Sequence, residues 1–319
     1  MHKYSTEFFT PPAWLQADQA QGLSQSLLLE GAPDGLAAEW SEQLLRLWLC
    51  RTGQGQACAG CPSCRLLAAG THPDYLEISS EGGKALGIDA IREGLEFLAF
   101  APQVGAVRVL RILAAEQMRT AAANALLKGL EEPPPRARIV LLSSAPARLL
   151  PTIRSRCQRL PMPAPAPAAC AAYLRASGLP EDAAAVLAQR YAQRPAYALA
   201  LFESALWAEV QQTRQQLLAP QVQSAVVWEL AAQWSKDEER VALLRDLMLD
   251  LHAEIFRLHH NVATVHTEFP KRTLARSEDA VWEDYQAWLR LAQEQRQNLQ
   301  ISMRMERLLW RWFFGGDES

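Results

Sequence analysis

The sequence lacks several features that would place it in a membrane or secreted class. No stretch approaches the roughly 18 consecutive apolar residues of a membrane-spanning helix, so we expect no membrane partner. The first residues, Met1 to Pro12, lack the apolar core of a secretory signal, and we expect a cytoplasmic protein. An excess of positive charge is also missing. Lys and Arg number 32 against 35 Asp and Glu, a net charge of −3 that argues against bulk attraction to nucleic acid, although a local basic face stays open.

Glycine and proline are scarce from Phe202 onward. In this part, apolar residues such as Leu244, Leu247 and Leu251 recur at spacings of three and four, the period of one helix face. The pattern predicts an all-α domain over residues 207–319, and we expect most of its Trp and Leu side chains to form the core.

The part before residue 163 has a different pattern, in which short apolar runs alternate with helical spacing. The expected strands are Ser26–Leu29, Tyr75–Ile78, Val107–Leu113, Arg138–Leu142 and Gln158–Leu160. The expected helices are Glu39–Leu49, Ile88–Phe100 and Thr120–Glu131. Alternation of this kind predicts an α/β domain with a parallel sheet over residues 1–162. The proline-rich stretch Pro161–Pro167 marks its end, and a small helical domain is expected over 163–206.

Four of the six cysteines lie close together in the sequence: Cys50, Cys58, Cys61 and Cys64. In a reducing cytoplasm this density indicates a metal site, not disulfides. Four thiolates fill a tetrahedral shell and leave no open position, so the pattern favours one structural Zn²⁺ ion at residues 50–64. An iron–sulfur cluster and four ordinary thiols are the alternatives. His72 lies nearby, but the four cysteines complete the shell, so we expect it to be structural.

The segment after the first expected strand has the outline of a phosphate-binding loop, with Gly31 and Gly35 leading into a helix. The pattern G-x-x-x-x-G-K-[ST], counted from Gly31, places Leu36 at the second glycine, Ala37 at the lysine and Ala38 at the hydroxyl. Two alanines can neither reach the phosphates nor hold magnesium. The sequence therefore predicts a nucleotide-binding fold with a degenerate site.

The acidic residue that an active nucleotide hydrolase needs at a strand end is missing as well. The expected strand Val107–Leu113 is followed by Ala114. Glu116 comes too late, and we expect it to be a solvated charge at a helix start.

Two longer motifs carry a specific resemblance. The stretch from Ala121 to Pro134, AAANALLKGLEEPP, looks like the A-x-N-A-L-L-K-x-L-E-E-P-P segment of bacterial DNA polymerase III clamp-loader subunits. The stretch from Leu149 to Cys157, LLPTIRSRC, is similar to their L-L-P-T-I-x-S-R-C. The cysteine quartet followed by G-T-H-P-D from Gly70 also fits their zinc module. This family implies an AAA+-like α/β domain with an inserted zinc module, a small helical lid domain and an all-α collar domain.

The resemblance also implies a function. Members of this family help assemble the sliding clamp on primed DNA, in a hetero-pentamer with ATPase subunits and a clamp-opening subunit. The pentamer is part of the DNA polymerase III holoenzyme, a DNA-directed DNA polymerase of the bacterial cytoplasm and nucleoid. The departures at Leu36, Ala37, Ala38 and Ala114 favour the non-hydrolysing delta-prime class. For that class we expect no bound ATP and no ATPase activity of the isolated chain.

The resemblance assigns roles to three basic residues. The arginine of S-R-C, here Arg156, is an arginine finger that reaches the ATP held by a neighbouring subunit. The helix with Lys128 faces DNA in the family, so a DNA contact by Arg119 or Lys128 is implied. The family's nucleotide-sensing arginine would align with Ala196, with Arg194 two residues before it.

Two other functions are compatible with the sequence. One is an ATP-hydrolysing clamp-loader subunit with an unorthodox phosphate loop. The other is a free-standing zinc-dependent adaptor without a role in replication. Nucleotide binding separates the first alternative from the delta-prime interpretation, and co-purification with clamp-loader subunits separates the second.

Overall fold

The structure is a computed structural model that describes residues 8–9, 12–15, 22–52, 57–79, 85–162, 165–262, 269–294 and 300–315. The chain divides into two compact units, Met1–Phe202 and Glu203–Ser319. Within the described ranges, no helix combines the length and the hydropathy required to span a bilayer.

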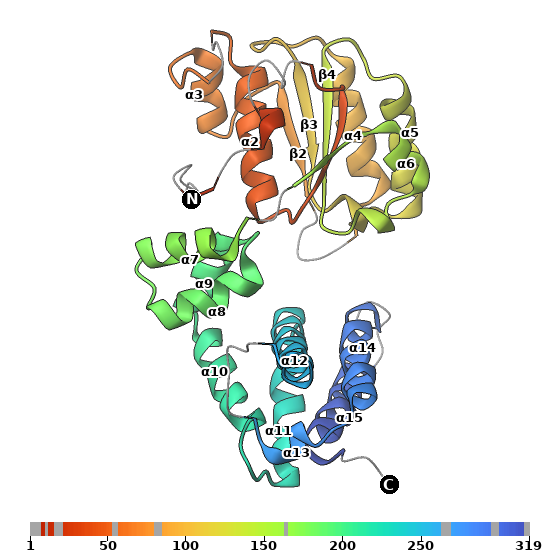
Figure 1. The fold of residues 1–319 in the computed structure, drawn as a ribbon. Coiled ribbons are helices and arrows are strands. Elements are labelled where there is room, and N and C mark those ends of the chain that lie inside the picture. The colour runs from red at the N-terminus through yellow and green to blue at the C-terminus, as the bar shows by residue number, and fades with distance from the viewer. Residues whose placement is uncertain are drawn as a thin grey trace. The chain divides into compact units, whose positions relative to one another are not determined.

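A five-stranded, entirely parallel sheet forms the centre of the first unit, with strand order β2-β3-β4-β1-β5 (Figure 1). The strands are β1 (Ser26–Glu30), β2 (Tyr75–Ile78), β3 (Arg108–Ile112), β4 (Ala137–Ser143) and β5 (Gln158–Pro161). Each predicted strand is present to within one residue at either end. The predicted α/β domain with a parallel sheet is confirmed.

Helices cover both faces of this sheet, which explains why the central strands are continuous apolar runs instead of alternating ones. Helix α2 (Leu36–Leu49) packs on one face, while α4 (Ile88–Ala99) and α5 (Thr120–Glu131) lie on the other (Figure 1). The fully buried strand residues Leu27 and Leu28 belong to opposite faces. Helices therefore cover both faces of the sheet, and the sheet holds the loops at the ends of its strands in place.

A short insertion between α2 and β2 contains α3 (Pro62–Ala68) and the cysteine cluster. It is followed by Asp74, whose buried carboxylate accepts backbone N–H bonds of 2.7 Å each from Gln103, Val104 and Gly105. Burial raises the pKa of Asp74, but these three donors outweigh it and hold the pKa below its usual value. The ionised side chain thus fastens the start of β2 to the loop before β3.

Small helical elements complete the first unit. They are η1 (Ala13–Leu15), η3 (Ala115–Gln117), η4 (Pro146–Arg148), α6 (Pro151–Arg156), α7 (Pro167–Ala176), α8 (Glu181–Tyr191) and α9 (Pro195–Glu203). Helix α7 ends just before Gly178, which has a φ of +100° that suits glycine and few other residues. The chain turns here between α7 and α8.

The second unit is helical throughout its described residues, as the sequence predicts. Its helices are α10 (Ala205–Leu217), α11 (Ser224–Trp234), α12 (Glu238–His259), α13 (Lys271–Leu274), α14 (Glu278–Glu294) and α15 (Ile301–Phe314). Trp234, Trp288 and Trp312 are buried in the core. Trp228, Trp282 and Trp310 are not, since each is about half exposed at 51%, 50% and 45%. The expectation that the tryptophans form the core thus holds for part of the set only.

Candidate functional site

The phosphate-loop outline lies where β1 ends and α2 begins, at the carboxyl edge of the sheet. Gly31 donates its N–H to the Ser143 carbonyl over 2.8 Å. A Cβ on Gly31 would come within 2.5 Å of the Ala37 Cβ, so only glycine fits. Gly35 is the N-cap of α2. The loop therefore keeps its backbone path, while its side chains lack the groups that contact phosphate.

The N-terminus of α2, which would bind an anion in a working phosphate loop, already has a protein partner. The Leu36 N–H donates to the Gln193 carbonyl over 2.9 Å. Beside this bond, Asp34 forms an ion pair with Arg194, whose guanidinium lies 4.0 Å from the centre of the Tyr197 ring. The turn between α8 and α9 thus supplies two groups at the amino end of α2: the Gln193 carbonyl and the Arg194 guanidinium.

Polar groups at the neighbouring strand ends also form hydrogen bonds within the protein. Ala114 follows β3, is buried, and has a positive φ of 50°. Glu116 is half-buried, and its Oε1 accepts a 2.6 Å bond from the Ser144 hydroxyl. The expectation of a solvated Glu116 is wrong, because η3 turns this residue back toward the end of β4. The Ser143 hydroxyl accepts the Ala145 N–H.

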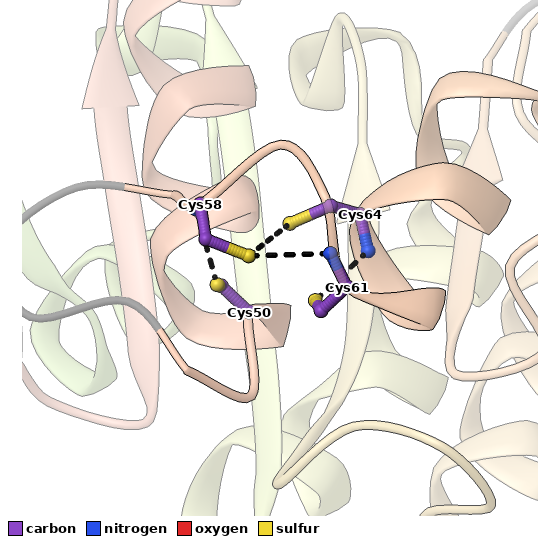
Figure 2. Close-up of side chains that lie close together, drawn as sticks. All are labelled: Cys50, Cys58, Cys61 and Cys64. Atoms are coloured by element: carbon purple, nitrogen blue, oxygen red, sulfur yellow. Dashed lines mark hydrogen bonds between the residues drawn. The ribbon is translucent and has the colours of Figure 1, made fainter.

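The four cysteines converge at the insertion, with sulfur atoms that all lie within 4.8 Å of one another (Figure 2). The Cys58 and Cys64 sulfurs are 3.9 Å apart, far longer than a disulfide bond. Four sulfurs arranged tetrahedrally about 2.3 Å from a zinc ion would be roughly 3.8 Å apart. The cluster thus has the dimensions of a four-thiolate metal site.

Backbone N–H groups point at these sulfurs and favour the thiolate form, which is the metal-binding one. Cys61 donates to the Cys58 Sγ over 3.3 Å, and Cys64 donates to the Cys61 Sγ over 3.4 Å (Figure 2). A hydrogen bond from the Thr52 side chain, with further backbone donors, lowers the pKa of Cys58 to about 5. Burial instead raises the pKa of Cys64 to about 12. The surroundings therefore favour thiolate at the exposed end of the cluster.

His72 is buried and has protein partners on both ring nitrogens. Its Nδ1 accepts the Asp74 N–H over 3.0 Å, so its Nε2 carries the proton and donates to the Ser63 hydroxyl over 2.7 Å. Ser63 in turn donates to the Leu49 carbonyl over 2.6 Å. Burial lowers the pKa of His72, which keeps the ring neutral. This chain of bonds agrees with the predicted structural role.

The arginine of the S-R-C motif is the last residue of α6, at the surface of the first unit. Arg156 Nη2 lies 2.5 Å from a carboxylate oxygen of Glu131, and its Nη1 donates to the Thr152 carbonyl over 3.0 Å. Its side chain is 34% exposed. The sequence did not identify Glu131 as its partner, although the E-E-P-P motif contains that residue.

Arg119 and Lys128 are both exposed, at the N-cap and in the last turn of α5. Asn124 and Lys128 are one turn apart and share a face of this helix. Lys128 lies on the predicted helix, and Arg119 lies directly before it.

Two residues at the phosphate loop were missed. Asp34 could have been identified from the sequence, because a carboxylate in a phosphate-binding loop opposes anion binding. Gln193 has none, because its contribution is a main-chain carbonyl that any residue would supply.

Comparison with known families and proteins adds the following. The family described as "DNA polymerase III, delta subunit" matches residues 13–166. The chain is 36% identical over 265 residues to the DNA polymerase III subunit delta' of Escherichia coli K12, covering 79% of this chain and 78% of that one. It is 42% identical over 153 residues to the subunit delta' of Pseudomonas aeruginosa, covering 48% and 45% of the two chains.

Among solved structures, a gamma subunit-related protein of DNA polymerase III from Thermotoga maritima superimposes with a TM-score of 0.50. The two sequences are 21% identical, and the match covers 93% of this chain and 96% of that one. At this identity the comparison concerns the fold alone.

The packing at Gly35 yields a prediction. A Cβ at this position would lie 2.4 Å from the Gln193 carbonyl oxygen. Gly35→Ala should therefore break the bond between Leu36 and Gln193 and lower the free energy of unfolding by about 1–3 kcal/mol. Urea denaturation followed by circular dichroism measures the change.

Gly87→Ala is the matched control. Gly87 is also a helix N-cap, for α4, and no atom lies within 4 Å of a Cβ built there. Its effect should stay below about 1 kcal/mol in either direction. Equal effects of the two substitutions would contradict the proposed close contact at Gly35.

Proposed function

Because the chain belongs to the DNA polymerase III delta-prime subunit family, we propose that it is a non-hydrolysing subunit of the clamp loader. In this role it helps place the sliding clamp on primed DNA. The observation that carries the proposal is the bond from the Leu36 N–H to the Gln193 carbonyl. It occupies the helix end at which an ATPase subunit would hold phosphate.

The side chains of this degenerate nucleotide site also disfavour nucleotide binding. Gly31, Gly35 and Leu36 supply only backbone, and Ala37 and Ala38 supply neither the ammonium nor the hydroxyl that triphosphate and magnesium require. Asp34 adds a carboxylate to the loop. Ala114 stands where a strand-end acid would position the metal. A nucleotide would thus meet an occupied amide and a carboxylate that is already paired with Arg194.

The chemistry of this chain lies instead at Arg156, which we propose acts in trans on the ATP of a neighbouring subunit. A planar guanidinium matches phosphate oxygens and offsets the charge that develops during phosphoryl transfer. The ion pair with Glu131 is partly exposed on both sides, at 34% and 48%. Exposed pairs of this kind contribute roughly 0–1 kcal/mol. Exchanging Glu131 for a phosphate therefore costs little.

We further propose that Cys50, Cys58, Cys61 and Cys64 hold one structural Zn²⁺ ion. The sulfur separations suit a closed tetrahedral shell. When bound, the ion supplies folding energy to the insertion and no reaction chemistry, since all four positions belong to protein. The ligands span the end of α2 and the start of α3, so the ion would fix α3 against α2.

The partners follow from the family. They are the clamp-loader ATPase subunits and the clamp-opening subunit of a cytoplasmic hetero-pentamer, with the sliding clamp and primed DNA contacted through the complex. A subunit tau of Bacillus subtilis is 35% identical to this chain over 104 residues. Arg119 and Lys128 are exposed on α5 and are candidates for a contact with the DNA backbone.

The test of the non-hydrolysing role is a calorimetric titration of the isolated chain with ATP and magnesium. We expect no binding at millimolar nucleotide, since no lysine or hydroxyl contacts the phosphates. The ATPase subunit of the same organism serves as the positive control. Magnesium-dependent binding at micromolar ATP would favour the alternative of an ATP-hydrolysing subunit.

The finger is tested in the reconstituted clamp loader. Arg156→Ala should leave folding intact and reduce DNA-stimulated ATP hydrolysis by about 10-fold or more, because charge at one ATP site is no longer offset. Arg175→Ala is the control, since Arg175 is likewise an exposed arginine paired with a glutamate, Glu181. Hydrolysis at the parental rate by the Arg156 variant would show that the residue has no such role.

The metal is tested by elemental analysis of the purified chain. We expect close to one zinc per chain, and Cys61→Ser should lose zinc together with thermal stability. Cys170→Ala is the control, because Cys170 is buried in α7 and outside the cluster. Iron in place of zinc would support the iron–sulfur alternative, and no metal in the parent protein would refute the site.

A further inference from the structure

A basic hollow of about 340 Å³ lies between α14 and α15 in the second unit. Four of its six lining residues are arginines: Ala287, Arg290, Arg304, Arg307, Leu308 and Arg311. Arg304, Arg307 and Arg311 follow at spacings of three and four, so α15 presents them on one face. Arg290 comes from α14. Such a concentration of one charge is unexpected in a chain with a net charge of −3.

One of the four arginines is held in place by the core. Arg311 Nε lies 2.7 Å from the Asp284 carboxylate, and its Nη2 lies 3.3 Å from Glu283. Asp284 is buried and also pairs with the buried Arg276. A single buried carboxylate is thus shared between two guanidinium groups. The pairing orients Arg311, and the two carboxylates of Asp284 and Glu283 balance the charges of Arg276 and Arg311, so other arginines supply the excess positive charge of the hollow.

Among the side chains that the structure describes, which exclude those of residues 292–299, no carboxylate forms an ion pair with Arg290 or Arg307. Both are exposed at the wall of the hollow. Arg290 and Arg307 carry like charges that repel one another across the hollow, and an anion that enters between them removes this repulsion. The guanidinium fork also suits bidentate binding of a carboxylate or phosphate. The lining of the hollow is therefore suited to an anion.

An apolar strip runs along α15 beside the arginines. Met303, Trp310 and Phe314 are exposed by 61%, 45% and 42%. They are seven and four residues apart and share a face with Arg307. The Trp310 and Phe314 rings pack together with centroids 4.6 Å apart, and Trp228 from α11 lies 6.2 Å from Trp310. A basic and an apolar strip thus lie side by side.

We propose that this surface binds an acidic protein segment that also carries bulky apolar side chains. Its carboxylates would lie against the four arginines, and its apolar residues would cover Met303, Trp310 and Phe314. Single-stranded nucleic acid fits less well, because it needs cations spaced along a track that follows the backbone. Here the cations gather in one hollow with an apolar floor of Ala287 and Leu308. This inference does not depend on the proposed function.

The test uses the full-length chain and fluorescence anisotropy. The probe is a labelled peptide of consecutive glutamates followed by leucine and phenylalanine. We expect binding that weakens as salt is raised, and the same peptide with glutamine for glutamate should bind at least about 10-fold more weakly. The double variant Arg290→Glu with Arg307→Glu should also weaken binding about 10-fold or more.

Arg257→Glu is the matched control, since Arg257 is an exposed arginine of α12 that does not line the hollow. It should change the affinity by less than about twofold. Circular dichroism checks that the variants fold, and the single variant Arg307→Gln replaces the double variant if that one does not. Unchanged binding by the arginine variants would overturn the proposal. Tighter binding of an oligothymidylate than of the acidic peptide would assign the site to nucleic acid instead.

Discussion

The hydrogen bond between the Leu36 N–H and the Gln193 carbonyl is the contact on which the arrangement of the phosphate-loop outline depends. It joins the amino end of α2 to the turn before α9, and the ion pair between Asp34 and Arg194 lies beside it. A phosphate could reach the end of α2 only by displacing the carbonyl, and Asp34 would then oppose its charge. A buried amide left without a partner costs roughly 1–3 kcal/mol. The closed arrangement is therefore stable without a nucleotide.

At the carboxyl edge of the sheet, polar groups likewise have partners within the protein. Parallel strands bring Gly31, Ala114 and Ser143 to one edge, the usual place for a ligand in this class of fold. In this chain the polar groups of that edge bind one another: Gly31 to Ser143, and Ser144 to Glu116. Arg156, the proposed arginine finger, and the cysteine cluster, the proposed zinc site, lie away from this edge.

Sequence patterns predicted the strands, the helices and the four clustered cysteines, because apolar period and cysteine spacing are local signals. Two other features were out of reach. The partner of Leu36 is a main-chain carbonyl more than 150 residues away, for which no side chain gives a signal. Glu116 looked solvated because its place in the sequence does not reveal that η3 turns it toward Ser144. Contacts between distant segments depend on the closed fold and cannot be read from spacing.

The tryptophans of the second unit show a further limit of periodicity. A stripe of large apolar residues indicates that a helix face is covered, but not by which chain. On α15, Met305, Leu309 and Trp312 are buried by the unit itself, whereas Met303, Trp310 and Phe314 on the opposite side of the helix are exposed. Each of these exposed apolar side chains would gain free energy when covered by another chain. The same helix therefore holds its own unit together and offers a surface to another chain.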